Sequence, residues 1–404
     1  MVEIFFHKEP ERIGGGITEI RYQGHRLILD MGADLPPEAA YGAAAKIYQE
    51  ENPAIEGVTQ GDAACDGVLI SHYHGDHIGL VQYVLPGVPI YMSRVCRDVS
   101  LLVKTKLKNT RLLAADDGGI ERLSEAQIFS QADFGKDFQI GPFTVRPLRV
   151  DHSAFDALAY LIFVDNKKIF FTGDFRNHGY TGKEFYKMLQ QYVGRVDVLL
   201  TEGTMIGREG REWSERELAQ AMRGVCAKYK YVLYLASSTN IDSLFSMAYA
   251  AEKTGKSFDI DAMQKEICEI IAENSPAGLY KQNLDWPTEG RQGFVKAIRM
   301  KDLAFAKRFY EKYGRESALI YSLWQGYVER CPELRALKEQ WGERFIPLHS
   351  GGHASVEALR RTLTLCADEN TLIVPMHTGS AAQFRELASK GKVAALHRGW
   401  SLQL

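Results

Sequence analysis

The sequence predicts an α/β protein in which a second α/β domain interrupts the first. A chain of 404 residues is too long for one ordinary hydrophobic core, so we expect two domains. Residues that can bind a metal follow apolar strands both early and late in the chain. The segment between them, residues 205–345, has its own alternation of strands and helices. We therefore expect one catalytic domain formed by residues 1–204 and 346–404, with residues 205–345 inserted between its two parts.

The first predicted element is a β-hairpin that ends at Asp30. Residues 13–30 contain two apolar strand patterns with Gln23 and Gly24 at the turn between them. Asp30 directly follows the second strand. It is interpreted either as a residue that orients a metal ligand or as a carboxylate that accepts hydrogen bonds from turn amides.

A metal site is indicated by four ligand-type side chains within six positions. They lie in residues 71–77, directly after the apolar run 68–70, which is typical of a short buried strand. A sharp turn after a strand directs alternate side chains to opposite sides, so one ion is expected at His72 and His74 and a second at Asp76 and His77. Imidazole and carboxylate ligands suit zinc or a neighbouring first-row ion.

Glycine within this segment has a predicted role of its own, because Gly75 is expected to relieve crowding in the turn. The alternative interpretation of the whole segment is a surface loop rich in histidine. Such a loop would require neither the aspartate nor the preceding strand.

The same arrangement recurs, because ligand-type residues repeatedly follow apolar strands. In open α/β sheets such strand ends gather at one edge, so we expect these residues to meet there. Any single one of these histidines would by default be structural, and it is the recurrence that favours a site. The recurring residues are His152, Asp174, Glu202, His353 and His377.

The middle segment contains a helix signal and a basic stretch. Ser214 and Glu217 form a capping box that predicts a helix start. Between Lys281 and Arg315, nine basic residues accompany four acidic ones, with four aromatic residues interleaved. The stretch is interpreted either as a phosphate-binding surface with stacking aromatics or, preferably, as an amphipathic helix whose aromatics lie in the core. A second basic series, for which a solvated helix face is preferred, comprises Lys104, Lys106, Lys108 and Arg111.

The composition excludes several classes of protein. The 49 basic and 51 acidic residues nearly balance, so any nucleic-acid function must rest on a local site. Six scattered cysteines without a CxxC pair indicate reduced thiols rather than a disulfide framework. The first residues do not form a signal sequence, and no segment is long and apolar enough to span a bilayer. We expect a soluble, cytoplasmic protein without a membrane partner.

Taken together, the motifs resemble those of the metallo-β-lactamase superfamily and, within it, the β-CASP nucleases, most closely the RNase J-like branch. The shared motifs are the HxHxDH signature, two later ligands and the three β-CASP motifs. They are matched by His72, His74, Asp76 and His77, by His152 and Asp174, and by Glu202, His353 and His377. The resemblance covers nearly the whole chain and implies an αββα sandwich with an inserted α/β β-CASP domain.

The resemblance also implies a site for two divalent metal ions, zinc with manganese as the alternative. One ion would be held by His72, His74 and His152, the other by Asp76, His77 and His377, with Asp174 between them. Two such ions lower the pKa of a shared water and stabilise the attacking and leaving oxygens of a phosphodiester.

Further residues are expected to act beside the ions. His353 is assigned the donation of a proton to the leaving oxygen, and Asp76 is a ligand with a catalytic role. Glu202 is expected to orient a ligating imidazole, unless it is only an acid at a strand end. Hydroxyls and free amides near helix starts are expected to bind a terminal phosphate. They belong to Ser237, Ser238, Asn240, Ser350, Gly351 and Ser355.

The function implied is that of an endoribonuclease, a 5′-to-3′ exoribonuclease, or both. A histidine at position 377 is typical of the RNA-processing members, whereas DNA-repair members usually carry valine there. The alternatives are a DNA nuclease, a small-molecule lactonase or thioesterase, and a scaffold that binds RNA without cutting it. Thr239 and Gly352 depart from the family pattern. The chain also stops about where the catalytic domain closes, without the further C-terminal domain usual in RNase J proteins, so a homodimer is an open expectation.

Overall fold

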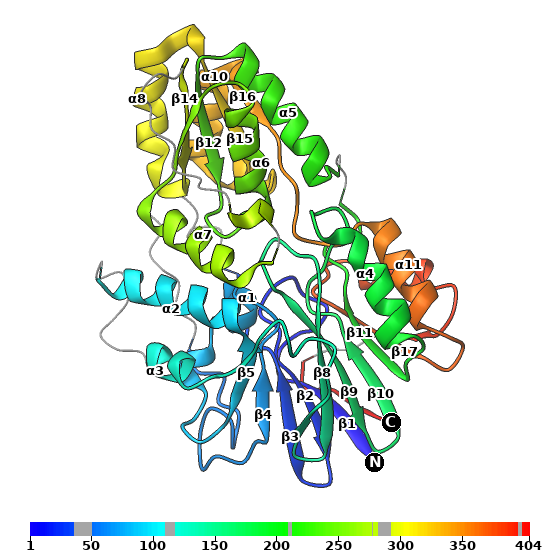
Figure 1. The fold of residues 1–404 in the computed structure, drawn as a ribbon. Coiled ribbons are helices and arrows are strands. Elements are labelled where there is room, and N and C mark those ends of the chain that lie inside the picture. The colour runs from blue at the N-terminus through cyan, green and yellow to red at the C-terminus, as the bar shows by residue number, and fades with distance from the viewer. Residues whose placement is uncertain (36–50, 110–117, 209–211, 277, 282–291, 395–397) are drawn as a thin grey trace.

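The computed structural model consists of a two-sheet sandwich that carries a third, smaller sheet at one end (Figure 1). It describes residues 1–404 except 36–50, 110–117, 209–211, 277, 282–291 and 395–397. The two ends of the chain lie side by side, because strand β1 (Val2–Phe6) pairs antiparallel with β19 (Ser401–Gln403).

The first sheet contains seven strands in the order β19-β1-β2-β3-β4-β5-β6. The predicted hairpin is confirmed, with Gln23 (φ 50°) and Gly24 (φ 86°) between β2 and β3. A turn with two positive φ values matches the right-handed twist of the strands on either side. The remaining strands are β2 (Thr18–Tyr22), β3 (His25–Leu29), β4 (Gly67–Leu69), β5 (Ile90–Ser93) and β6 (Gln127–Phe129).

The second sheet also contains seven strands, in the order β18-β17-β11-β10-β9-β8-β7. Strands β10, β11 and β17 are parallel to one another, and β9 is antiparallel to both β8 and β10. The strands are β7 (Phe138–Ile140), β8 (Phe143–Arg149), β9 (Leu158–Val164), β10 (Lys167–Phe171), β11 (Val198–Glu202), β17 (Leu372–Met376) and β18 (Lys392–Val393).

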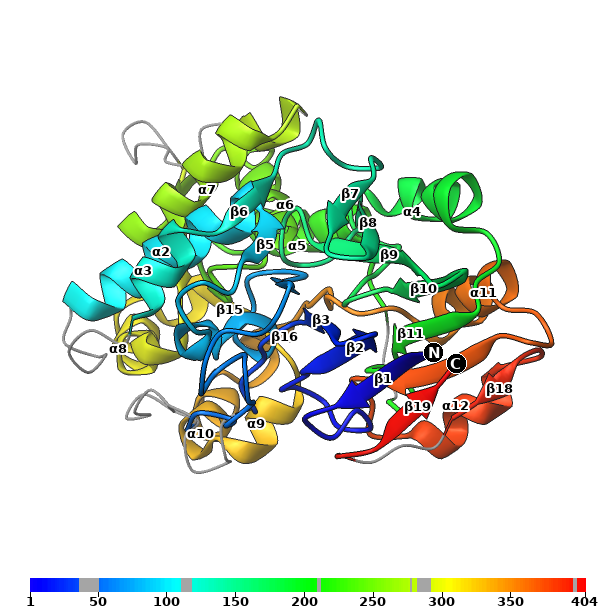
Figure 2. The ribbon, with the colours of Figure 1, turned by 90° about the horizontal axis from the view of Figure 1, so that it is seen from below.

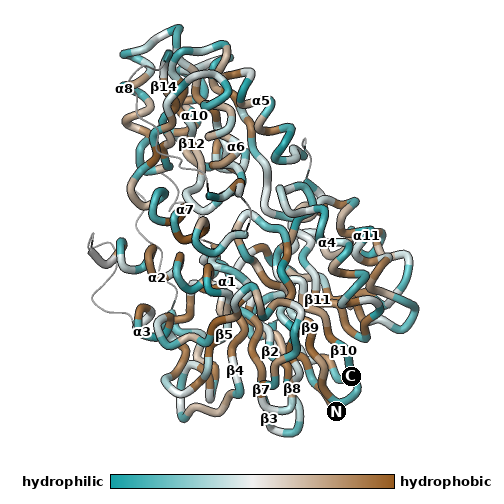
Figure 3. Tube along the Cα trace, in the orientation of Figure 1, coloured by the Kyte–Doolittle hydropathy of each residue, from teal (hydrophilic) through white to brown (hydrophobic). Residues whose placement is uncertain are grey.

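The inner faces of these sheets form a continuous apolar core. Ile4 and Leu27 of the first sheet belong to the same buried cluster as Phe143, Tyr160 and Leu200 of the second. Many of the core strands are brown in Figure 3, whereas the surface loops are mostly teal. Helices cover the outer faces and complete an αββα sandwich (Figure 2). They are α2 (Arg94–Asn109) and α3 (Gly119–Ser124) on the first sheet, and α4 (Gly182–Met188), α11 (Val356–Cys366) and α12 (Ala381–Leu387) on the second.

The third sheet is formed by five parallel strands in the order β13-β14-β12-β15-β16. Its strands are β12 (Tyr231–Ala236), β13 (Ser257–Asp259), β14 (Phe294–Ile298), β15 (Ser317–Ser322) and β16 (Phe345–Pro347). One face is covered by α5 (Glu215–Lys228), α6 (Ile241–Glu252) and α7 (Ala262–Asn274). The other face is covered by α8 (Leu303–Tyr313), α9 (Gly326–Arg330) and α10 (Pro332–Trp341). We propose that this layer is the inserted domain, residues 205–345.

Local signals in this layer agree with the sequence. The predicted capping box is present, because the Ser214 hydroxyl accepts a hydrogen bond from the Glu217 amide at the start of α5. Of the basic stretch, Phe294 and Phe309 pack in the cluster that contains Trp341, which favours the amphipathic helix over a stacking surface. Arg291 lies outside the described residues.

The first basic series likewise makes contacts within the protein. On α2, Lys104 donates to the Gln82 side chain and Lys106 forms an ion pair with Glu266 of α7. The side chain of Lys108 and all of Arg111 lie outside the described residues. Within the described ranges, no helix is both long enough and apolar enough to cross a membrane.

The ends of six strands in the sandwich define the place where the ligand-type residues meet. Asp30 follows β3 and the HxHxDH segment follows β4 in the first sheet. His152, Asp174 and His377 follow β8, β10 and β17 in the second sheet, and β11 ends at Glu202. The expectation of a single sheet edge is therefore wrong: the sandwich brings the edges of two sheets together.

Candidate metal centre

The HxHxDH segment turns sharply after β4 into the one-turn helix α1 (Gly75–Ile78). A Cβ at Gly75 would meet no atom within 4 Å, so the predicted steric need for glycine there is wrong. The need lies instead at Gly32 and Gly79. A Cβ would lie 1.8 Å from the Asp76 carbonyl oxygen at Gly32, and 2.3 Å from the Gly75 carbonyl oxygen at Gly79. Close backbone crossings therefore hold α1 in place.

Three imidazole nitrogens converge on one point. His74 Nδ1 lies 3.1 Å from His72 Nε2 and 3.2 Å from His152 Nε2. Ligands bound at 2.0–2.1 Å to a tetrahedral ion lie about 3.3 Å apart, so this spacing fits one zinc-like ion. Burial lowers the pKa of His72 and His152 well below the ordinary value and that of His74 to about 4. Neutral rings with free lone pairs are the form that binds a metal.

A second group of ligand atoms adjoins the first. His377 Nε2 lies 3.1 Å from Asp76 Oδ2, and His77 Nε2 lies 3.1 Å from Asp174 Oδ2. Ligand atoms of Asp76, His77 and His377 lie within 4.8 Å of one another, as do those of His72, His77 and Asp174. Asp174 thus lies between the two groups, and buried carboxylates beside imidazoles at this spacing suit a second divalent ion.

Four of the five imidazoles in the two groups have a hydrogen-bond partner on their outward nitrogen. The partners are the Ser71 hydroxyl for His72 (3.0 Å), Asp30 Oδ2 for His77 (2.7 Å), the Gly352 carbonyl for His152 and the Thr204 hydroxyl for His377 (2.8 Å). Such contacts fix the tautomer and the orientation of a metal-binding imidazole. Gly352, one of the departures from the family pattern, has room for this contact because a Cβ there would lie 2.7 Å from His152 Cε1.

Asp30 combines the two roles between which the sequence left a choice. Besides contacting His77, its carboxylate accepts a hydrogen bond from the Ser71 amide at 2.7 Å. Asp30 (φ 60°) and His377 (φ 50°) both adopt the left-handed conformation directly after a strand. Non-glycine residues hold this conformation at an energetic cost, and such residues cluster at functional sites.

Glu202 contacts His353 rather than one of the predicted ligands. Glu202 Oε2 lies 3.0 Å from His353 Nδ1, and Oε1 accepts from the Phe175 and Ala354 amides at 2.9 and 3.3 Å. Burial alone would lower the pKa of His353. The nearby carboxylates of Glu202 and Asp174 outweigh this effect and raise the pKa to about 9. The carboxylate thus orients the histidine that we expect to act beside the ions.

The predicted phosphate-binding residues lie in two neighbouring loops. The Asn240 side chain donates to the Ser350 carbonyl at 3.3 Å, which joins the loop after β12 to the loop after β16. Asn240 Oδ1 and the Ser238 hydroxyl are buried without a partner among the described residues. The Ser237 hydroxyl bonds to that of Thr239.

Two members of the predicted set already have contacts within the protein. The Ser350 hydroxyl donates to the Trp213 carbonyl at 3.0 Å. Ser355 accepts a hydrogen bond from the Ala358 amide and caps α11. The Gly351 carbonyl accepts from Arg176, so only the unpartnered atoms of the other loop remain available to a ligand.

Arg176 is a residue that the sequence did not indicate. It is completely buried and lies within 3.3 Å of carboxylate oxygens of Asp151, Glu215 and Asp242. It also donates to the Gly351 carbonyl at 3.0 Å. Burial raises the pKa of Asp151 to about 6 and that of Glu215 to about 7, although Arg176 opposes both shifts. This cluster, named here the Arg176 cluster, joins α5 and α6 to the loop that carries His353.

Tyr73, inside the HxHxDH segment, was also missed as a contact residue. Its hydroxyl donates to the Thr239 carbonyl at 3.3 Å and accepts from the Phe155 amide at 2.8 Å. It links the metal-binding segment directly to the loop after β12. Its aromatic character and place between two ligands were the only signals in the sequence.

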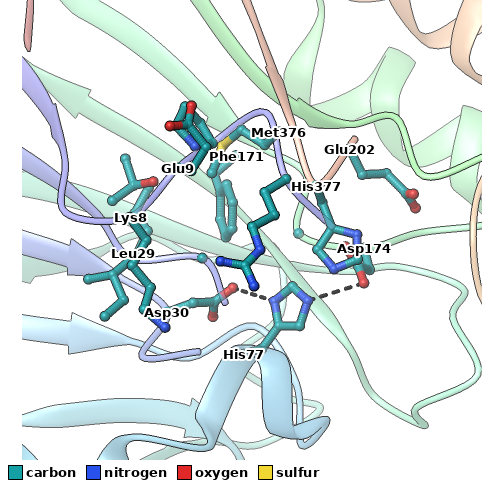
Figure 4. Close-up of a pocket in the computed structure, with 16 residues that line it drawn as sticks. Lys8, Glu9, Leu29, Asp30, His77, Phe171, Asp174, Glu202, Met376 and His377 are labelled. Atoms are coloured by element: carbon teal, nitrogen blue, oxygen red, sulfur yellow. Dashed lines mark hydrogen bonds and ion pairs between the residues drawn. The ribbon is translucent and has the colours of Figure 1, made fainter. Parts of the chain in front are cut away.

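A pocket opens beside the second group of ligands (Figure 4). His77 lies between Asp30 and Asp174 at its base, with His377 next to Asp174. Lys8 and Arg12, from the segment after β1, line the outer part. Asp34 pairs with both cations, at 3.0 Å from Lys8 and 2.9 Å from Arg12.

Comparison with known sequences gives one family match and several relatives. The sequence model of the Beta-lactamase superfamily domain matches residues 25–232. Ribonuclease J from Mycoplasma genitalium is 24% identical over 411 residues, which cover 92% of this chain and 68% of the relative. Ribonuclease J from Mycoplasma pneumoniae is 23% identical, and that from Sinorhizobium meliloti 25% identical. The alignments with these two cover 64% and 58% of this chain, and the chain spans only 45% and 40% of their lengths.

Among solved structures, a protein of unknown function from Enterococcus faecalis has the same fold. The two chains superpose with a TM-score of 0.76 at 19% identity, and each is covered completely. This similarity concerns the arrangement of the elements in space.

Proposed function

The chain belongs to the beta-lactamase superfamily, and from this premise we propose that it is a metal-dependent phosphodiesterase that cleaves RNA. The observation that carries the proposal is the convergence of the seven predicted ligands from four separate segments of the chain into two adjoining groups. The name Ribonuclease J, which its relatives carry, supports RNA as the substrate class.

Two divalent ions, zinc or manganese, fit the donor set. His72, His74 and His152 would hold one ion and Asp76, His77 and His377 the other, with Asp174 shared. When bound, such ions lower the pKa of a shared water and stabilise the oxygens of the reacting phosphodiester.

His353 is proposed to donate the proton that the leaving oxygen requires. Its Nδ1 faces Glu202, which leaves Nε2 to face the substrate. No described residue forms a hydrogen bond with Nε2, and the side chain is 23% exposed. With its pKa raised to about 9, the ring carries a proton at neutral pH. Glu202 acts through His353 and is a positioning residue.

The third sheet supports a polymeric substrate over a lactone or a thioester. The loop after β12 contacts the metal-binding segment through Tyr73 and the loop after β16 through Asn240, which adds a second wall to the site. A small molecule needs only loops above the metals, whereas a nucleic-acid strand needs an extended surface. We propose that the unpartnered Ser238 hydroxyl and the second N–H of the Asn240 side-chain amide donate to the 5′-phosphate. Endonucleolytic and 5′-to-3′ cleavage both stay part of the proposal, as do a homodimer and a cytoplasmic location.

The test is an assay with end-labelled and circular RNAs on protein loaded with zinc or manganese. Linear RNA with a 5′-monophosphate or a 5′-triphosphate reports direction and end preference, and circular RNA reports internal cleavage. Single-stranded DNA, a lactone and a thioester serve as competing substrates. We expect cleavage of RNA that chelation abolishes. Hydrolysis of only the lactone or the thioester would overturn the proposal.

A further inference from the structure

A group of two arginines and a tryptophan lies where the third sheet meets the sandwich, outside the metal centre. The guanidinium carbon of Arg208 lies 5.1 Å from the centroid of the Trp324 ring, and that of Arg330 lies 4.9 Å from it. Arg208 follows β11 by six residues, whereas Trp324 follows β15 and Arg330 ends α9. All three residues lie within the inserted segment 205–345, with Arg208 near its start. The group is here named the Trp324 platform.

The Trp324 ring is held in a fixed position. The Tyr321 hydroxyl donates to the Trp324 carbonyl at 2.7 Å, and the Tyr327 ring contacts the indole edge-on at a centroid distance of 5.4 Å. A Cβ at Gly326 would lie 2.3 Å from the ring, so the indole rests directly on that backbone. The ring is only partly buried, and no described residue accepts a hydrogen bond from its N–H. The partly buried indole is thus a fixed aromatic group with two guanidinium groups over its ring and a donor that no described residue uses.

Arg208 is a cation without a carboxylate partner among the described residues. Burial lowers the pKa of its guanidinium, Glu202 raises it and Arg330 lowers it again. Two positive groups beside one ring repel each other, and a partly buried arginine normally pairs with an anion. Since none of the residues that the structure describes forms an ion pair with Arg208, an anionic ligand would complete the group.

A short stretch of the chain connects the Trp324 platform to the metal centre. Only five residues separate Arg208 from Glu202, which contacts His353. Within that connection, the Thr204 hydroxyl contacts His377. A Cβ at Gly207 would meet the Ser380 hydroxyl at 2.9 Å, so the segment passes close to the loop after His377. A ligand on the platform can therefore belong to the same extended molecule as the bond that reacts at the metals.

We propose that Trp324, Arg208 and Arg330 bind a single-stranded segment of RNA beside the cleavage site, with a phosphate on the guanidinium groups and a base against the indole. Aromatic rings stack on bases irrespective of sequence, and guanidinium groups bind phosphates in a bidentate geometry. The inference rests on the proposed function, because it names a substrate contact of the same site. The Trp324 platform would also provide a stacking surface beside the metals. Phe294 and Phe309, from the stretch between Lys281 and Arg315, do not provide one because they pack in the core.

Binding is tested on metal-free protein, so that no cleavage interferes. The probe is a fluorescein-labelled single-stranded RNA of about 12 nucleotides, titrated by anisotropy over a range of salt concentrations. We expect Trp324→Leu to weaken binding roughly tenfold. Arg208→Gln should lower the slope of log Kd against log salt by about 0.7, the value for one phosphate contact to a single strand. Arg330→Gln should act in the same direction.

Matched controls come from the same layer of the molecule. Arg223 is exposed on α5, and Arg223→Gln makes the same change of charge. Tyr249 is 38% exposed on α6, and Tyr249→Leu removes an aromatic ring from the surface of the same layer. Both should bind RNA as the wild type does. Circular dichroism and the unfolding midpoint verify that each variant is folded, and Trp324→Phe should restore most of the affinity because it keeps a ring.

Different results would refute the Trp324 platform and the nuclease activity. If wild-type protein cleaves RNA and the Arg208 and Trp324 variants keep both affinity and salt slope, the platform is overturned and the nuclease stands. If wild-type protein binds RNA through Trp324 but cleaves none with either metal, the nuclease is overturned and the platform stands. Preference for a DNA strand of the same sequence over RNA would overturn the RNA assignment of the platform.

Discussion

The strand ends of the sandwich and those of the third sheet lie next to each other, but they differ in chemistry. At the sandwich, imidazoles and carboxylates are in direct contact, and four of the five ligand-type rings have their outward nitrogen bonded. After β12 and β15, the Ser238 hydroxyl, the Asn240 amide oxygen and the Trp324 N–H have no partner among the described residues, and the guanidinium groups of Arg208 and Arg330 lie beside the indole. The first region is arranged to hold cations and the second to receive an anion. A strand of nucleic acid satisfies both.

The largest effect is expected when the sandwich edge loses the carboxylate that lies between the two ligand groups. Asp174→Asn should release at least one metal per chain and lower RNA cleavage by more than about 10⁴-fold, because the ionisation of the attacking water depends on the ions. Elemental analysis and the end-labelled RNA assay check the two parts. Asp137→Asn, on the surface near β7, is the control. Two metals per chain in Asp174→Asn would refute the ligand assignment.

Loss of the proposed proton donor should separate catalysis from metal binding. His353→Ala is expected to lower kcat by about 10²- to 10⁴-fold while the metal content stays at two per chain. Glu202→Gln should lower kcat less, since the ring remains, and should leave RNA affinity unchanged. A fully active His353→Ala variant would remove the role from this residue.

The Arg176 cluster, at the junction between the two regions, is expected to make the free energy of unfolding depend on pH. Burial raises the pKa of Glu215 from 4.5 to about 7, so the folded protein binds this proton more tightly than the unfolded chain. Its contribution to the free energy of unfolding is therefore present at low pH and is lost as pH rises from about 4.5 to 7, by up to about 3 kcal/mol. Urea denaturation of the metal-free protein should show this loss in the wild type and a smaller one in Glu215→Gln. A steeper loss in the variant would contradict the assignment.

The smallest effect is expected at the uncharged edge. Asn240→Ala should weaken the preference for 5′-monophosphorylated over 5′-hydroxyl RNA by about 3- to 10-fold, because it removes one side-chain contact to a phosphate. Ser355→Ala is a poor test of the same pocket, since loss of the α11 cap costs about 1 kcal/mol of stability. An unchanged preference in both Asn240→Ala and Ser238→Ala would place the phosphate elsewhere.

The sequence predicted well those features that depend on residues close together in the chain. The alternation of strands and helices predicted the α/β class, and the run from His72 to His77 predicted a metal site. Contacts that depend on chain crossings were not predictable. The carboxylate partners of Arg176 lie 25, 39 and 66 residues away along the chain. The residues next to Arg176 in the sequence do not predict that its side chain is buried. Gly75 was singled out and Gly32 was not for the same reason: only the fold shows which backbone another segment approaches.

The pairing of β1 with β19 and the late position of His377 bear on how the molecule assembles. Asp76 and His377 are separated by 301 residues, so their contact forms only after nearly the whole polypeptide is available. Contacts of such long range are slow to form, whereas the parallel layer in between contains all its own strands and can order earlier. A ribosome-bound chain that has not yet exposed β17 would lack one histidine and have an open sandwich. Metal capture would then mark the completion of folding rather than its beginning.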